Sequence, residues 1–192
     1  WLFDNVTQVF NSDDGKFVEV TPSYHLASAI PINDSQRNVW DAVVINNAQL
    51  TGIEKLTYNP NKAQRDDLYL QQINPIVTLN GQTTIWTQLT SQKRSSKLQD
   101  ISSVRLYLLI DKNLKKFAHG YLPSANDEIT WNSAGKEVRN FLGSIKADRG
   151  LESFEVTVGA TEFEKRNKTF HIDVEFVPVN QTEKIFLNYT VR

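Results

Sequence analysis

Cysteine is absent from this 192-residue chain. Its absence excludes disulfide scaffolds, thiolate metal sites and cysteine nucleophiles. Methionine is absent as well, and the chain begins at Trp1, so we expect it to be a piece of a longer protein. No run approaches the roughly 20 apolar residues that cross a bilayer, and no signal peptide is recognisable, so the sequence predicts no direct insertion into a membrane.

An excess of charge of one sign is also lacking. The chain has 21 basic and 22 acidic residues, and its formal net charge is −1. Nonspecific binding to nucleic acid needs many cations that neutralise phosphates, and this balance does not supply them. The basic cluster of Lys93, Arg94 and Lys97 could contact nucleic acid or an acidic partner, but its polar surroundings favour a solvated connection. No aromatic residue interleaves the cluster, so we predict no nucleic-acid partner.

Patterns that carry catalysis or metal binding are missing too. His25, His119 and His171 do not have the spacing of metal ligands. Asp66 and Asp67 are neighbours in a helical segment, where side chains diverge by about 100° and cannot converge on one ion. We therefore predict no catalytic residue, no cofactor and no metal. A hydrolase that uses clustered carboxylates is the weaker alternative, because no constellation supports it.

The composition that is present, 40% apolar and 22% charged, is ordinary for a globular protein. Cap residues and apolar spacing predict several helices. They cover residues 24–30 after a Ser23 cap, 62–69, from Ser102 or Ser103 to His119 with Gly120 as the stop, and about 126 to Gly150. The segment 33–35 (Asn-Asp-Ser) is typical of a turn or a second cap.

Alternating apolar and polar residues predict strands. They cover residues 17–20, the hairpin arms 76–79 and 83–86 around Asn80-Gly81, and 154–158, 170–176 and 185–191. The order of elements predicts an α+β fold, with a mixed sheet that carries helices packed on one face. We expect residues 1–50 to be the C-terminal portion of a preceding α/β domain, and residues 51–192 to form the main domain.

The helix predicted over 127–149 has a basic side. Its apolar residues fall on one face at about 100° per residue, and Lys136, Arg139, Lys146 and Arg149 fall mostly to one side of that face. Charged borders are routine on helices, and cations near a C-terminus favour the helix dipole. The alternative is a surface for a protein partner that presents an acidic stripe.

The last predicted strand is a second candidate surface. Ile185, Leu187, Tyr189 and Val191 alternate with polar residues almost to the end of the chain. An edge strand is a template for pairing with another chain. An internal strand that ends the domain, or a truncated sequence, would give the same pattern.

Several segments in order resemble the phage contractile tail sheath family. They are Leu56-Thr57-Tyr58-Asn59-Pro60, Ala63, Arg65-Asp66, Leu68-Tyr69, Ile73-Asn74-Pro75-Ile76-Val77, Gly81-Gln82 and Ile85-Trp86. The resemblance continues from about residue 18 to the end of the chain. Thr87-Gln88-Leu89-Thr90 departs from the family's Gln-Lys-Thr-Leu, and Pro123 is displaced from the family's Pro-Asn-Asp-Glu turn.

The resemblance implies the C-terminal, tube-proximal part of a sheath subunit. Such subunits form hexameric rings around a tail tube, and contraction drives the tube through the host envelope. The implied partners are other sheath subunits, the tube protein, the baseplate and the tail terminator, in a virion tail assembled in the host bacterial cytoplasm. Lys136, Arg139, Lys146 and Arg149 would face the tube, and the strand 184–191 would join the intersubunit mesh. An R-type pyocin or a secretion-system sheath is the alternative, and we expect the fragment alone to be monomeric.

Overall fold

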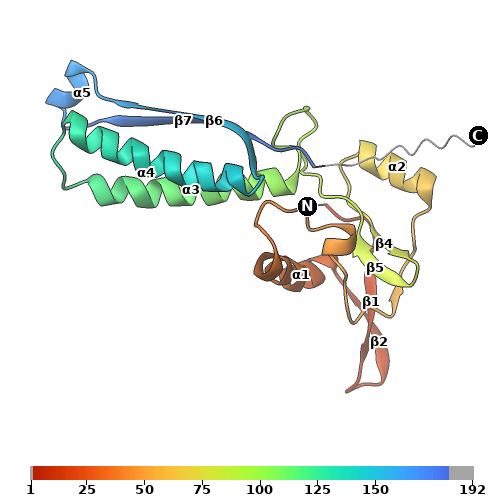
Figure 1. Ribbon diagram of the computed structural model, residues 1–192. Helices are drawn as coiled ribbons and strands as arrows, with labels where there is room; N and C mark the ends of the chain where they lie inside the picture. Colours follow the sequence, from red (N-terminus) through yellow and green to blue (C-terminus); the bar gives the residue numbers. More distant parts are fainter. Residues whose placement is uncertain (1, 182–192) are drawn as a thin grey trace, which may run out of the picture. The chain divides into compact units, whose positions relative to one another are not determined.

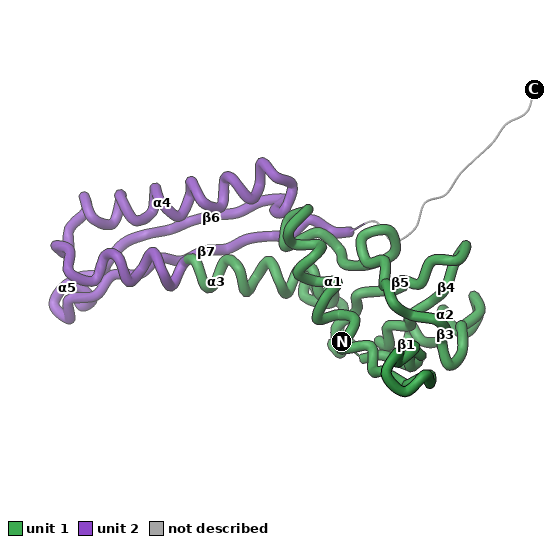
Figure 2. Tube along the Cα trace, turned by 90° about the horizontal axis from the view of Figure 1, so that it is seen from below, with its two compact units in different colours: residues 1–113 green, residues 114–192 purple. Residues whose placement is uncertain are grey.

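The computed structural model describes residues 2–181 (Figure 1), so the predicted strand with Ile185, Leu187, Tyr189 and Val191 lies outside the described residues. The chain divides into two compact units, residues 1–113 and residues 114–192 (Figure 2). The division falls inside one helix, α3 (Ile101–Tyr121). It therefore differs from the boundary expected at residue 50.

A three-stranded antiparallel sheet shows why residues 1–50 are not set apart in unit 1. β1 (Thr7–Asn11) lies between β2 (Lys16–Val20) and β3 (Lys55–Leu56). In this register Phe10 faces Phe17, and Thr7 pairs with both Val20 and Leu56. The pairing of β1 with β3 joins the two sides of the expected boundary.

A second sheet in unit 1 is the hairpin of β4 (Ile76–Leu79) and β5 (Gln82–Ile85). Its turn has Asn80 at φ 50° and Gly81 at φ 80°. Two positive φ values are what a type I′ turn requires, and Asn-Gly is the dipeptide that tolerates them best. The predicted hairpin is confirmed.

Two asparagine side chains cover the other edge of β4. Asn5 donates from Nδ2 to the Ile76 carbonyl at 2.7 Å and accepts from the Ile76 N–H at 3.0 Å. Asn59 makes the same pair of bonds with Thr78, at 3.0 and 3.1 Å. Each side-chain amide makes the two hydrogen bonds that a peptide group of a neighbouring strand would make. This edge of β4 is therefore hydrogen-bonded although no strand among the described residues lies beside it.

The helices α1 and α3 correct four of the expected boundaries. α1 (Pro22–Gln36) begins after Thr21 and continues through Pro31 and residues 33–35, where a turn was expected. α3 begins before Ser102 and runs past Gly120. Buried contacts override the local signals: Ser102 is 2% exposed and accepts a hydrogen bond from Gln88, and Asp34 of α1 pairs with Arg105 of α3.

The core of unit 1 is built from α1, the irregular segment 43–50 and the small sheets. α2 (Lys62–Leu70) is the expected short helix, and Asn61 and Gln64 form a capping box at its start. The short 3-10 helix η1 (Ile45–Asn47) follows α1. The buried apolar cluster consists of Leu26, Ala29, Val43, Ala48, Leu50, Leu56, Ile76 and Ile85.

Unit 2 contains a long hairpin with helices beside it (Figure 1). α4 (Glu128–Ala147) leads to β6 (Leu151–Gly159), the short helix α5 (Glu162–Arg166) and β7 (His171–Pro178). β6 and β7 are antiparallel, with Phe154 opposite Phe176. The α+β class is confirmed, but among residues 2–181 the sheets are three small antiparallel ones, not one mixed sheet. Nowhere in the same range does a helix have both the length and the hydropathy to cross a membrane.

The close packing of α4 on β6 depends on a glycine. A Cβ atom on Gly135 would lie 2.5 Å from Cγ2 of Val158 and 3.1 Å from Nη1 of Arg139. Such contacts are well inside van der Waals separation, so any side chain at this position would push the helix and strand apart. Trp131, Ala134, Val138, Leu142 and Ile145 bury the same face of α4, as the sequence predicts.

Candidate functional site

The ends of α4 are ordered by specific backbone contacts. At the N-terminus, the Asp127 carboxylate accepts the Thr130 N–H at 2.9 Å, and this backbone hydrogen bond lowers the pKa of Asp127 below its usual 3.8. At the C-terminus, Arg149 has φ 64° and the Gly150 N–H donates to the Ile145 carbonyl at 2.8 Å. This is the left-handed helix termination that usually takes glycine. Both ends of α4 therefore lie close to where the sequence predicts them.

The four cations predicted to face a partner, Lys136, Arg139, Lys146 and Arg149, are called the basic edge below. All four are exposed, but they do not have the same role. Arg139 donates from Nη2 to the Val156 carbonyl at 3.2 Å, beside Gly135. Arg149 carries the helix termination. Lys136 and Lys146 are the members most available to another molecule.

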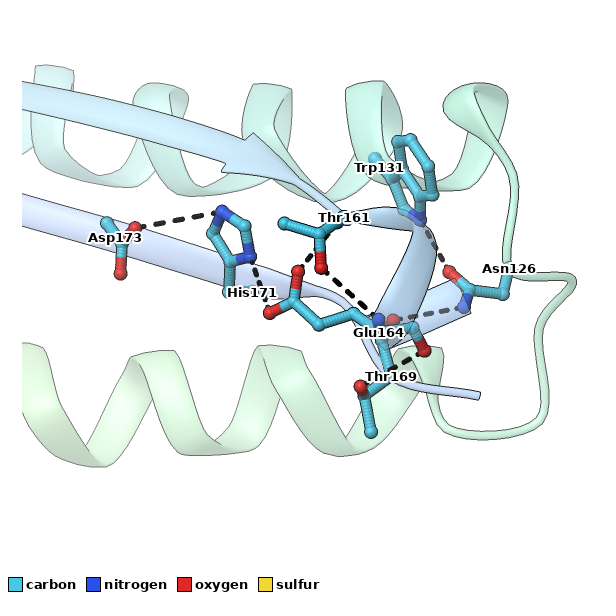
Figure 3. A network of polar contacts seen from close by, with 7 residues as sticks. All are labelled: Asn126, Trp131, Thr161, Glu164, Thr169, His171 and Asp173. Atoms are coloured by element: carbon cyan, nitrogen blue, oxygen red, sulfur yellow. Dashed lines mark hydrogen bonds and ion pairs between the residues drawn. The ribbon is translucent and has the colours of Figure 1, made fainter. Parts of the chain in front are cut away.

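A polar network ties the loop between α3 and α4 to the segment before β7 (Figure 3). Asn126 accepts from the indole Nε1 of Trp131 at 2.7 Å and donates to the Thr169 carbonyl at 3.0 Å. The ammonium group of Lys165 lies 5.3 Å from the Trp131 ring centroid, within cation–π range. The contacts fix the end of unit 2 that holds α5.

Glu164 is at the centre of the same network (Figure 3). Its carboxylate accepts the Thr161 N–H at 2.7 Å, while Thr161 Oγ1 accepts the Glu164 N–H at 3.2 Å. His171 Nδ1 lies 3.0 Å from the same carboxylate, and His171 Nε2 lies 3.8 Å from Asp173. The backbone hydrogen bond from Thr161, followed by the contact with His171, lowers the pKa of Glu164 below its usual 4.5. His171 therefore lies between two carboxylates, and these contacts give it a structural role.

These two carboxylates predict an acid sensitivity of unit 2. Because the folded pKa values of Asp127 and Glu164 are below the usual 3.8 and 4.5, their contribution to stability is present above those values. It is lost as the pH falls through the lower folded values. We expect the melting temperature of unit 2 to fall between about pH 5 and pH 2. The combined variant Asp127→Asn and Glu164→Gln should show a shallower fall, and an unchanged pH profile would contradict the assignment.

The residues that carry the family resemblance are largely structural. Asn74 is 0% exposed and donates from Nδ2 to the carbonyls of Leu89 at 2.9 Å and Leu2 at 3.3 Å. Its Oδ1 accepts the Leu89 N–H at 2.7 Å and the Thr87 hydroxyl at 2.9 Å. Arg65 lies over the ring of Trp86, 4.6 Å from its centroid. This segment holds unit 1 together.

The titratable residues singled out in the sequence have ordinary surroundings in the part of the chain that the structure describes. From residue 2 to residue 181, no three His, Asp or Glu side chains are arranged to hold a metal ion. Asp66 pairs with Lys62 at 2.9 Å between two exposed side chains on α2. His25 is 4% exposed and lies 2.7 Å from the Thr7 hydroxyl, and burial lowers its pKa. Lys93 and Arg94 lie exposed in a loop.

Comparison with known proteins identifies relatives by sequence, although no protein-family model matches the chain. The tail sheath protein of Vibrio phage KVP40 is 31% identical over 117 residues, which cover 60% of this chain and 17% of that protein. The tail sheath protein of Enterobacteria phage T4 is 26% identical over 117 residues, 60% of this chain and 18% of that protein. The chain is homologous to phage tail sheath proteins.

Solved structures give this sheath homologue the same fold over nearly all its length. The helical sheath of the anti-feeding prophage in its contracted state matches with a TM-score of 0.85 and 22% identity, and covers 97% of this chain and 54% of that one. The contracted PVC sheath complex matches with a TM-score of 0.85 and 20% identity, and the match covers 96% of this chain and 54% of that one. The sheath tail protein Lin1278 of Listeria innocua matches with a TM-score of 0.69 and 14% identity, and the match covers 96% of this chain and 44% of that one.

The sheath resemblance expected from the sequence is thus confirmed. The sheath homologue spans about half the length of these solved chains, and its aligned part spans less than a fifth of the two phage proteins. Sequence reasoning missed the network of Figure 3. The signal was present in Thr161 and Glu164, which have the spacing of a capping box, but a five-residue helix has too few apolar positions to show a period.

Proposed function

We propose that this sheath homologue is a structural, non-catalytic part of a contractile sheath subunit. The subunit polymerises as rings around a tail tube, and the contracting lattice drives the tube through the host envelope. The observation that carries the proposal is the match of 97% of the chain to a sheath in its contracted state. The partners are other sheath subunits, the tube protein, the baseplate and the tail terminator. The site of action is the virion tail, after assembly in the host bacterial cytoplasm.

The basic edge is proposed as the surface that holds the tube. Polar contacts between exposed charges are weak and screened by salt, so they can break when the sheath widens. Because Arg139 contacts the Val156 carbonyl and Arg149 forms the helix end, we assign tube contact chiefly to Lys136 and Lys146. Attachment should therefore weaken as ionic strength rises.

Contraction is proposed as a rigid-body change of packing between subunits. Such a change needs bodies that keep their shape, and the tight contact of α4 with β6 at Gly135 supports this for unit 2. The segment with Ile185, Leu187, Tyr189 and Val191 is proposed to add a strand to a sheet of a neighbouring copy. Because that strand is covalently part of its own subunit, it would keep neighbouring subunits connected while they rotate.

A second candidate is the sheath of an injection device that is not part of a virion. It is favoured by the matches with a TM-score of 0.85 to structures of the anti-feeding prophage and of the PVC extracellular contractile injection system. The mechanics are the same in both cases. Particles that carry a DNA-filled capsid would support the phage assignment, and particles without one would support the second.

The proposal is tested by negative-stain microscopy of the full-length protein that contains this chain. Long hollow cylinders of stacked rings are the expected result, since lateral and axial contacts of one subunit propagate indefinitely. Dispersed monomers under every assembly condition would overturn it. The 192-residue chain alone is expected to remain monomeric.

Charge reversal tests the basic edge separately. We expect Lys136→Glu with Lys146→Glu to reduce co-sedimentation of sheath with isolated tubes by about tenfold or more at about 0.15 M salt. The melting temperature should not change, because both side chains are exposed. Lys93→Glu with Arg94→Glu is the matched control, with the same change of charge in an exposed loop of unit 1. Equal attachment by both variants would contradict the assignment.

A further inference from the structure

The β1–β2 hairpin of unit 1 exposes an aromatic pair. Phe10 and Phe17 face each other across the strands, with ring centroids 5.5 Å apart in an edge-to-face arrangement. They are 50% and 61% exposed, and Val18, on the opposite face of the hairpin, is 46% exposed. Figure 1 shows the far end of the hairpin standing out from the rest of unit 1. Paired aromatic rings on a projecting element are typical of anchors at protein interfaces.

The turn of the same hairpin is acidic and ordered. Asp13 and Asp14 are both exposed. Asn11 accepts the Asp13 N–H at 3.1 Å and donates from Nδ2 to the Asp14 carboxylate at 3.1 Å. The hairpin tip, defined as residues 10–18, therefore combines apolar rings with negative charge in a preformed shape. A preformed element loses little conformational entropy when it binds.

Unit 2 contains a cavity with the complementary character. Its volume is about 420 Å³, in the range of ligand-binding clefts. The walls are largely apolar, from Leu114, Ala118, Val138, Phe170, Ile172 and Val174. Leu122, which is 75% exposed, also lines the cavity, so it opens to solvent there.

Two of the six polar residues in the lining of the cavity are cationic. Lys115 and Lys168 both line it. The Tyr121 hydroxyl donates to the Glu137 carboxylate at 2.9 Å. Burial and this contact raise the pKa of Tyr121, so the hydroxyl remains a neutral donor. An apolar cavity with lysines in its lining fits an apolar partner that carries carboxylates.

We propose that the hairpin tip of one copy inserts into the cavity of unit 2 of the next copy. Phe10 and Phe17 would pack against the apolar walls, and Asp13 and Asp14 would lie near the lysines. This contact rests on the proposed sheath function and names one of its subunit interfaces. Because the two surfaces differ, the contact is heterologous and propagates from copy to copy as a ring or filament.

Because this chain has no cysteine, the contact is testable once any cysteine elsewhere in the full-length protein has been changed to serine. Ser12, in the hairpin turn, and Ser124, in the cavity lining, are changed to Cys in the full-length protein that contains this chain. After assembly and oxidation, a ladder of covalent oligomers is expected on a non-reducing gel. Ser12→Cys or Ser124→Cys alone cannot give a ladder. Cylinders without a ladder, or a cross-link confined to the monomer, would overturn the contact while the sheath function stands. A protein that forms no cylinders would overturn both.

Charge exchange and ring removal provide independent readouts in the same assay. Asp13→Lys and Lys168→Glu should each reduce the yield of the ladder by about tenfold, and their combination should restore it. Phe17→Ala should reduce the yield by about tenfold or more. Leu70→Ala is the control, because Leu70 is 77% exposed in the same unit but lies on α2. A combination no better than the single charge variants, or equal losses for Phe17→Ala and Leu70→Ala, would contradict the proposal.

Discussion

Asn74→Ala is expected to lower the free energy of unfolding of unit 1 by about 3 to 5 kcal/mol. The side chain is 0% exposed and makes four hydrogen bonds, so its removal leaves several buried groups without partners. The Leu89 N–H and carbonyl lose their bonds together. The loss is a large fraction of the stability of an ordinary domain. Hydrogen exchange resolved to peptides should show faster exchange around residues 74–89 and little change in unit 2.

Two further variants separate the hydrogen bonds from the loss of volume. Asn46→Ala is the control, because Asn46 is exposed in η1, and its effect should stay within about 0.5 kcal/mol. Asn74→Asp keeps the shape but directs a carboxylate at the two carbonyls that the amide donates to. It should be at least as destabilising at neutral pH and should recover partly in acid, where a protonated carboxyl can donate. An Asn74→Ala protein as stable as the control would refute this role of the Asn74 side chain.

Gly135→Ala is expected to destabilise unit 2 by about 1 to 2 kcal/mol. The new Cβ would lie 2.5 Å from Val158 Cγ2, and a β-branched side chain on a strand has little freedom to move away. Overpacking of this kind costs about 1 to 3 kcal/mol, and the better helix propensity of alanine offsets up to about 1 kcal/mol. The measurement is thermal or denaturant unfolding followed through Trp131, with the other tryptophans replaced by phenylalanine.

The same substitution elsewhere in α4 should have the opposite sign. Gly143 has no heavy atom within 4 Å of the position its Cβ would take. Gly143→Ala should therefore stabilise unit 2 by up to about 1 kcal/mol through helix propensity alone. If Gly135→Ala and Gly143→Ala shift the stability of unit 2 in the same direction, the close approach of α4 to β6 is not the reason for a glycine at position 135.

Elements with a local signature could be predicted from the sequence. The Asn80-Gly81 turn, the short helix over 62–69 and the apolar stripe of α4 each need only neighbouring residues to be recognised. The exposure of the four basic-edge side chains could also be predicted in this way, because it depends only on the turn of the helix, whereas their contact with a tube stays a prediction. The difference in role between Lys136 and Arg139 could not be found, since it depends on β6.

Features that depend on distant residues were missed or misplaced. α1 continues through Pro31, where local rules end a helix, and Asp34 near its end pairs with Arg105 on α3. β1 has a mixed polar sequence, and its partner β3 is more than 40 residues away. Nothing near Asn74 in the sequence indicates that its amide contacts Leu2 and Leu89. Contacts between residues far apart in the sequence determine these features, and the periodicity of the sequence carries no information about such contacts.

The hydrogen bonds of Asn5 and Asn74 in unit 1 also bear on the order in which the chain can fold. Asn5 and Ile76 are 71 residues apart, and Asn74 and Leu2 are 72 apart, so unit 1 must close long loops before its hydrogen bonds form. In unit 2, Arg139 reaches Val156 across 17 residues and β6 pairs with β7 through one short connection. Short-range contacts form faster than long-range ones. When the whole chain refolds from denaturant, the half that the ribosome makes last is therefore the half that folds first.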